Sequence, residues 1–230
     1  LKGRPVTLYQ EVHCNKTKEK PATHKAFLKT LHAMLPSNCR PIIVTDAGYK
    51  SPWFRAVRAL GWDIIGRIRK PHFYSLDRGD TWQCIRYLYT QATCRPKRFD
   101  NSQIVRSNPF ACTLVLFKQK SKGRHASNPD GTRKASKRSK AHAQGAKDPW
   151  LLATTLASHR SLSKQVVAIY RQRMQIEEGF RDMKSTKFGL GYEQNKSVKK
   201  QRLTILVLVT TLASLVAILL GMMLVSSNKH

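Results

Sequence analysis

The chain has 230 residues, enough for one folded core with an insertion or a small second domain. It carries 42 Lys and Arg against 13 Asp and Glu, a formal net charge of +29, and 41% of its residues are apolar. The apolar content excludes a wholly disordered basic chain. The charge attracts polyanions, so nucleic acid is the expected partner and an anionic membrane surface the alternative. The five cysteines are odd in number and include no CxxC pair, which argues against zinc fingers and disulfide frameworks.

The first third of the chain alternates between strand and helix patterns. Short β-branched and apolar runs predict strands at residues 5–12, 41–45 and 62–68. Apolar residues at helical spacing predict helices at residues 22–35 and 51–60. This order predicts an α/β fold with a largely parallel sheet.

Asp46 directly follows the predicted strand at residues 41–45. In open α/β sheets the reactive groups lie beyond the carboxyl ends of the strands. Asp46 is therefore a candidate site residue.

Residues 118–147 separate two further predicted strands, at 111–117 and 149–154. The segment is rich in Lys, Arg, Ser, Gly and His, which predicts a flexible basic loop. A solvated loop and a segment that wraps nucleic-acid phosphates are both compatible with this composition.

A helix predicted from residue 163 onward carries a stripe of four chemically distinctive side chains. At about 100° per residue, positions i, i+3, i+7 and i+14 fall on one narrow strip of a helix. In this chain those positions are Tyr170, Arg173, Glu177 and Lys184.

The remaining faces of this helix are also predicted from its spacing. An apolar stripe is expected to face the core, formed by Ile169, Ile176, Phe180 and Met183. Glu178 and Asp182 are expected to point to solvent.

Two interpretations of Glu177 are open. It belongs to an ordinary amphipathic helix whose boundary charges pair at i+3 and i+4, or it shares divalent cations with Asp46. Hard cations such as Mg²⁺ take carboxylate oxygens as ligands. Two such ions close together activate a water and stabilise the leaving oxygen of a phosphodiester.

These residues resemble a known family. The Y-R-E-K signature of bacterial cut-and-paste DDE transposases of the insertion-sequence-four group is matched by Tyr170, Arg173, Glu177 and Lys184. IVTDAGY at residues 43–49 resembles the strand that bears the family's second catalytic Asp. PWLLAT at residues 149–154 resembles the strand shortly before the catalytic helix. The similarity runs over residues 3–200.

The resemblance implies an α/β fold with a ribonuclease-H-like core, here incomplete, a β-rich insertion and C-terminal helices. The expected regions are the partial core with Asp46 (1–68), the insertion with the basic loop (69–159), the catalytic helix region (160–200) and an apolar C-terminal helix (201–230).

The resemblance also assigns roles to site residues. It implies that Asp46 and Glu177 are the second and third acids that bind Mg²⁺ or Mn²⁺. Contacts with DNA phosphates near the cleaved transposon end are implied for Tyr170, Arg173 and Lys184. Trp150 matches a tryptophan that stacks on a flipped base. A buried core position is the equal alternative for Trp150.

The implied function is metal-dependent hydrolysis at transposon ends followed by strand transfer into target DNA. The expected partners are double-stranded DNA and a second copy of the chain in a synaptic complex, in the bacterial cytoplasm at the nucleoid. No acid maps onto the family's first catalytic Asp, because Glu11 lies on the wrong strand. We therefore expect a fragment that does not cleave DNA alone. A non-catalytic DNA-binding module, which needs neither Asp46 nor Glu177, is the alternative.

Residues 203–225 contain no charge and lie between basic residues. Their length and flanks fit a membrane span, and a membrane-anchored protein is a third hypothesis. The family resemblance implies an apolar helix after the catalytic one, which favours burial in the protein and makes a membrane partner less expected.

Overall fold

The computed structural model describes residues 4–69, 72–119, 131–132, 136, 148–187, 189–195, 197 and 199–227. The chain divides into two compact units. Arg40–Tyr170 forms one, called here the sheet unit. Leu1–Cys39 and Arg171–His230 form the other, called the helical unit.

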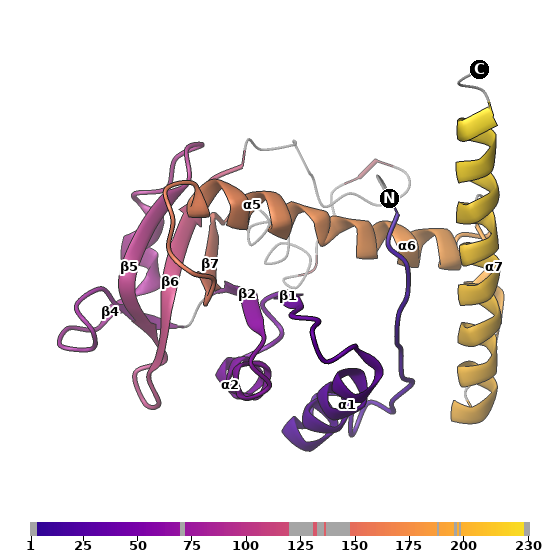
Figure 1. Cartoon of the computed structure of the whole chain (residues 1–230), viewed down its shortest axis with the longest axis horizontal. Helices are drawn as coiled ribbons and strands as arrows, with labels where there is room; N and C mark the ends of the chain where they lie inside the picture. The colour runs from indigo at the N-terminus through magenta and orange to yellow at the C-terminus, as the bar shows by residue number, and fades with distance from the viewer. Residues whose placement is uncertain are drawn as a thin grey trace. The chain divides into compact units, whose positions relative to one another are not determined.

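The sheet unit contains a seven-stranded sheet in the order β1-β2-β7-β6-β5-β3-β4 (Figure 1). The strands are β1 (Ile42–Thr45), β2 (Asp63–Ile68), β3 (Phe73–Ser75), β4 (Gln83–Cys84), β5 (Lys97–Ile104), β6 (Phe110–Phe117) and β7 (Trp150–Thr154). β1 and β2 are parallel, and the other described neighbours pair antiparallel. Mixed pairing of this kind joins the first two strands to the β-rich part in one sheet.

Helices cover both faces of the sheet around β2. On one face, α5 (Leu162–Gln172) packs into a core cluster that includes Ile65 of β2. Successive strand residues point to opposite faces, so Gly66 faces α2 (Ser51–Ala59) on the other side. A Cβ at Gly66 would lie 2.3 Å from Cζ of Phe54, which leaves room only for glycine. The short helix α3 (Ile85–Tyr89) follows β4.

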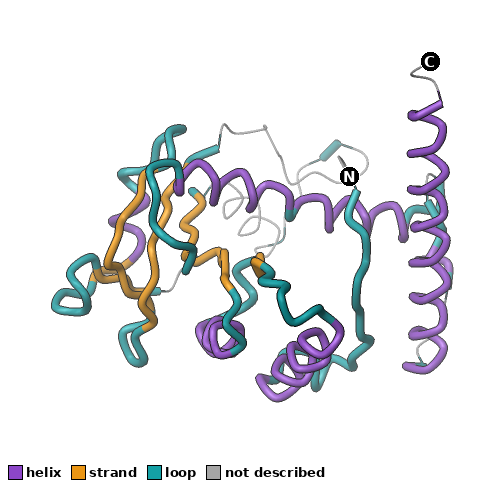
Figure 2. The backbone as a smooth tube through the Cα atoms, viewed as in Figure 1, coloured by secondary structure: helices purple, strands orange, loops and turns teal. Residues whose placement is uncertain are grey.

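The helical unit consists of three helices, a short turn and an extended segment. Its elements are α1 (Pro21–Met34), α6 (Met174–Lys184), the 3-10 turn η1 (Tyr192–Gln194) and α7 (Lys200–Ser227). Residues 4–13 form neither helix nor strand (Figure 2). In this segment the Tyr9 ring lies 4.9 Å from Phe27 of α1. Gln10 Nε2 donates to the Val207 carbonyl at 3.3 Å and to Thr211 Oγ1 at 2.8 Å. The segment therefore ties α1 to α7.

The mixed α/β class and most of the predicted elements are confirmed. Each observed boundary lies within a few residues of the prediction for the helices at 22–35 and 51–60 and the strands at 41–45, 62–68, 111–117 and 149–154. Local periodicity determines these elements, so the sequence alone is sufficient for them.

Two predictions about the sheet are wrong. Residues 5–12 are not a strand, because their side chains contact α1 and α7 and their backbone joins no described strand. The sheet is not largely parallel, since only β1 and β2 pair in that way among the described strands. Because residues 5–12 are not a strand, the alternating strands and helices of the first third of the chain form one parallel pair, β1 and β2.

Two further predictions concern the basic loop and the C-terminal helix. Most of the loop at residues 118–147 lies outside the described residues. The helix at 203–225 is present as α7, but its expected burial is not observed, because none of its described residues is buried. Its most apolar stretch has a mean hydropathy of 2.7, and by length and composition alone α7 is able to cross a membrane. Apolar side chains lie on all sides of α7. Its contact with residues 4–13 covers one of these sides and leaves the others exposed.

Candidate active site

Asp46 is an exposed carboxylate immediately after β1. Its Oδ1 accepts a hydrogen bond from the Gly48 backbone N–H at 2.8 Å. A Cβ at Gly48 would lie only 3.0 Å from that oxygen, so glycine permits the tight turn. Burial, followed by the charge of Asp46, raises the pKa of nearby Tyr49. The turn therefore holds the exposed carboxylate through its Oδ1.

Glu177 lies in the first turn of α6, and its side chain is 53% exposed. Arg173 Nη2 donates to its Oε1 at 2.7 Å across an i,i+4 spacing. An acid in the first turn also interacts favourably with the positive end of the helix dipole. Both interactions are local, so they account for Glu177 as a helix-stabilising residue without requiring a ligand.

Glu177 also borders an open pocket on α6. The pocket is lined by Glu177, Phe180, Arg181 and Lys184. It therefore brings the signature residues Glu177 and Lys184 to one surface, where a carboxylate lies beside basic side chains that attract phosphate.

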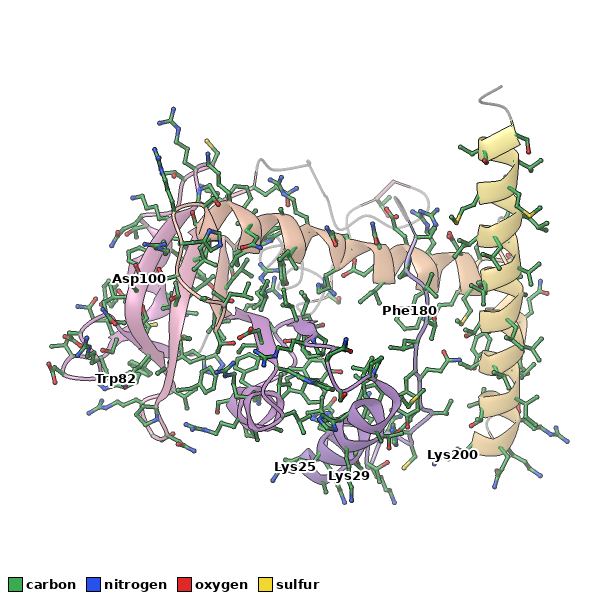
Figure 3. The ribbon with its side chains drawn as sticks, in the orientation of Figure 1. Lys25, Lys29, Trp82, Asp100, Phe180 and Lys200 are labelled. Atoms are coloured by element: carbon green, nitrogen blue, oxygen red, sulfur yellow. The ribbon has the colours of Figure 1, made fainter. Side chains whose placement is uncertain are left out.

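The other face of α6 corrects two predictions. Ile169 packs against the core cluster as expected, but Ile176 is exposed, and so is Phe180 (Figure 3). No described residue of α6 is buried, so the α6 part of the apolar stripe does not face a core. Glu178 and Asp182 are not simply solvated, because both pair with Arg4. The N-terminal segment occupies the place that sequence periodicity assigned to solvent.

Tyr170 and Trp150 lie together in the sheet unit. Tyr170 lies near the end of α5, is only 2% exposed and belongs to the core cluster between α5 and the sheet. Its ring meets the partly buried Trp150 edge-on at 4.9 Å. The Trp150 ring also lies 5.7 Å from Phe117. In this conformation Tyr170 has no open path to a phosphate, and Trp150 has a packing role.

Arg67 links Tyr170 to a pair of arginines that the sequence analysis did not single out. Its Nη2 donates to the Asp148 carbonyl at 3.3 Å, and its guanidinium interacts electrostatically with nearby Tyr170. Burial, and then the charge of neighbouring Arg69, lowers the pKa of Arg67. Two guanidinium groups in one half-buried place favour an anion between them. The sequence does contain a sign of this pair: Arg67 and Arg69 are two residues apart at the end of β2, a spacing that puts both side chains on one face of the sheet.

Tyr89 is the second tyrosine in this neighbourhood. Burial, followed by the charge of Asp148, raises its pKa to about 12, while Arg67 and Arg69 act in the opposite direction. Tyr89 therefore stays protonated at physiological pH, as a hydrogen-bond donor.

The site residues are divided between the two units. Asp46, Trp150 and Tyr170 belong to the sheet unit, and Glu177 and Lys184 to the helical unit. Among the residues that the structure describes, no group of three or more His, Cys, Asp or Glu is placed to hold a metal. The donor chemistry nevertheless fits a hard cation, because Asp46 and Glu177 are exposed carboxylates that each engage one oxygen in the hydrogen bonds described above.

Comparison with known proteins gives one family match. The model of the transposase DDE domain matches residues 7–216. No curated protein matches the chain. The matched region contains Asp46, Trp150 and the stripe from Tyr170 to Lys184, so every residue of the candidate site lies inside it.

Proposed function

Because the chain belongs to the transposase DDE domain family, we propose that it serves DNA transposition of the insertion-sequence-four type. In that reaction a phosphodiester at a transposon end is hydrolysed, and the freed 3′-hydroxyl then attacks target DNA. The observation that carries this proposal is the family match, which contains all of the candidate site residues. The net charge of +29 supports binding to double-stranded DNA.

Asp46 and Glu177 are the proposed ligands of Mg²⁺ or Mn²⁺. Both present carboxylate oxygens, the donors that hard cations prefer. When bound, such ions activate a water nucleophile and stabilise the leaving oxygen. Arg173 holds one oxygen of Glu177 at 2.7 Å, which limits the rotamers of the carboxylate.

Phosphate contacts are proposed for Arg173 and Lys184 on the helical unit. In the sheet unit, Tyr170 acts through Arg67, because the tyrosine is buried and the arginine is only half-buried. Trp150 keeps its proposed stacking role for a flipped base, supported by its partial exposure. We also propose that two copies of the chain pair the transposon ends in a synaptic complex at the bacterial nucleoid.

We further propose that this 230-residue polypeptide does not cleave DNA by itself. Asp46 and Glu177 supply two carboxylates, and no other acid of the sequence maps onto the family's first catalytic Asp. Metal-dependent nicking of a transposon-end duplex tests this directly. Robust nicking that disappears in Glu177→Ala would show that the chain carries a complete site.

A non-catalytic DNA-binding module is the second candidate, favoured by the ion pair that gives Glu177 a purely structural role. The two candidates differ in the need for metal. Under the transposase proposal, Asp46→Asn weakens Mn²⁺ binding and leaves salt-dependent DNA binding intact. Under the module hypothesis, Asp46→Asn changes neither property.

A further inference from the structure

Gly179 is an unusual residue for the interior of α6. Glycine destabilises a helix interior relative to alanine because it loses more backbone freedom on folding. In the structure, a Cβ at Gly179 would lie 3.2 Å from Cγ and 3.6 Å from Cδ of Pro5. Glycine therefore lets the N-terminal segment approach the backbone of α6 closely.

Arg4 forms two ion pairs with α6 directly beside this contact. Its Nη1 lies 2.9 Å from Glu178 Oε2, and its Nε lies 2.6 Å from Asp182 Oδ2. Glu178 and Asp182 are one helical turn apart, and like charges at that spacing repel when unpaired. One guanidinium thus bridges two carboxylates that would otherwise destabilise the helix. The N-terminal segment crosses α6 here (Figure 1).

The three contacts together restrict rotation of α6 about its own axis. Arg4 touches two positions on one side of the helix, and Pro5 touches Gly179 about 100° further round. Glu177 lies about 100° away on the opposite side of Glu178. None of these three contacts involves the Glu177 carboxylate, whose Oε1 pairs with Arg173, and together they fix the direction in which the Glu177 side chain leaves the helix.

We infer that Arg4 and Pro5 form a positioning clamp on α6 that sets the direction of Glu177. This inference rests on the proposed metal-binding role of Glu177. It also explains why two of the few acids in a strongly basic chain serve a single arginine: Glu178 and Asp182 hold the clamp, and Glu177 faces the ligand. Arg4 is accordingly a positioning residue that touches neither metal nor DNA.

The first test measures hydrogen exchange of α6 amides in the full chain. Arg4→Glu is expected to reduce their protection about tenfold, because two ion pairs are replaced by like-charge contacts. The charge swap Arg4→Glu with Glu178→Arg is expected to restore protection. Lys18→Glu is the control, since it makes the same charge change at an exposed pair with Glu19. Unchanged protection in Arg4→Glu would overturn the clamp.

The second test measures Mn²⁺ affinity by electron paramagnetic resonance. If the clamp only stabilised α6, this affinity would not change when the clamp is removed. Arg4→Glu is expected to weaken Mn²⁺ binding several-fold although it adds negative charge, and the charge swap to restore it. A loss of α6 protection with unchanged Mn²⁺ affinity would overturn the positioning role. If Glu177→Gln also leaves Mn²⁺ binding unchanged, the proposed function fails, and exchange in α6 still decides whether the clamp exists.

Discussion

Replacing Glu177 by glutamine separates the two interpretations of this acid. The substitution keeps the size of the side chain and removes its charge. In the structure this loses the 2.7 Å ion pair with Arg173, whose own side chain is 16% exposed while that of Glu177 is 53% exposed. An i,i+4 pair of this kind contributes about 0.2–0.5 kcal/mol. Loss of the favourable charge in the first turn costs about 0.3–1 kcal/mol more.

We therefore expect Glu177→Gln to lower the free energy of unfolding by about 0.5–1.5 kcal/mol. Urea denaturation measures this change. Mn²⁺ affinity is expected to fall at least about tenfold, because one of two proposed carboxylate ligands is lost. Glu19→Gln is the matched control: its carboxylate is 86% exposed and only 4.0 Å from Lys18, so both quantities should stay unchanged.

The opposite pattern would refute this reasoning. If Glu177→Gln lowers the free energy of unfolding by more than about 2 kcal/mol and leaves Mn²⁺ affinity unchanged, the acid is a structural helix residue. The ion pair with Arg173 would then be its whole role.

Three further predictions concern the sheet unit and α7. Gly66→Ala is expected to destabilise the fold by about 1–3 kcal/mol, since the new Cβ would meet the Phe54 ring at 2.3 Å; wild-type stability in urea would contradict this packing. The pKa of Tyr89, raised from 10.0 to about 12, gives a stability contribution present below pH 10 and lost as pH rises toward 12. Tyr89→Phe should therefore lose stability less steeply over that range, and parallel curves would argue against the shift. Carbonate extraction of the expressed protein tests α7, none of whose described residues is buried: retention in the membrane pellet is expected if the helix spans a bilayer, and release would contradict a span.

The elements of the fold were predictable where a local pattern determines them. β1 and α2 follow from β-branched runs and helical spacing within a few residues of chain. The pairing of strands was not predictable, because it depends on residues distant in sequence. Residues 5–12 have the composition of a strand, yet Gln10 hydrogen-bonds Thr211 of α7, 201 positions away in the sequence.

The candidate site shows the same division between local and distant information. Spacing alone singled out Glu177, and the structure adds its pairing with Arg173, the N-cap residue of α6. The sequence did not predict that Arg173 separates α5 from α6. The contact of Arg4 with Glu178 joins residues 174 positions apart, and no periodicity contains it. Arg67 was missed because its importance comes from burial beside Tyr170, which only tertiary packing creates.

Under the proposed function, Asp46 and Glu177 hold the same divalent cation. Mn²⁺ binding by the wild type, Asp46→Asn, Glu177→Gln and the double variant forms a cycle that tests this claim directly. Each single variant is expected to bind Mn²⁺ more weakly than the wild type, and the double variant is expected to bind hardly more weakly than either single variant. Additive losses, or single variants that bind like the wild type, would show that the two carboxylates do not share an ion.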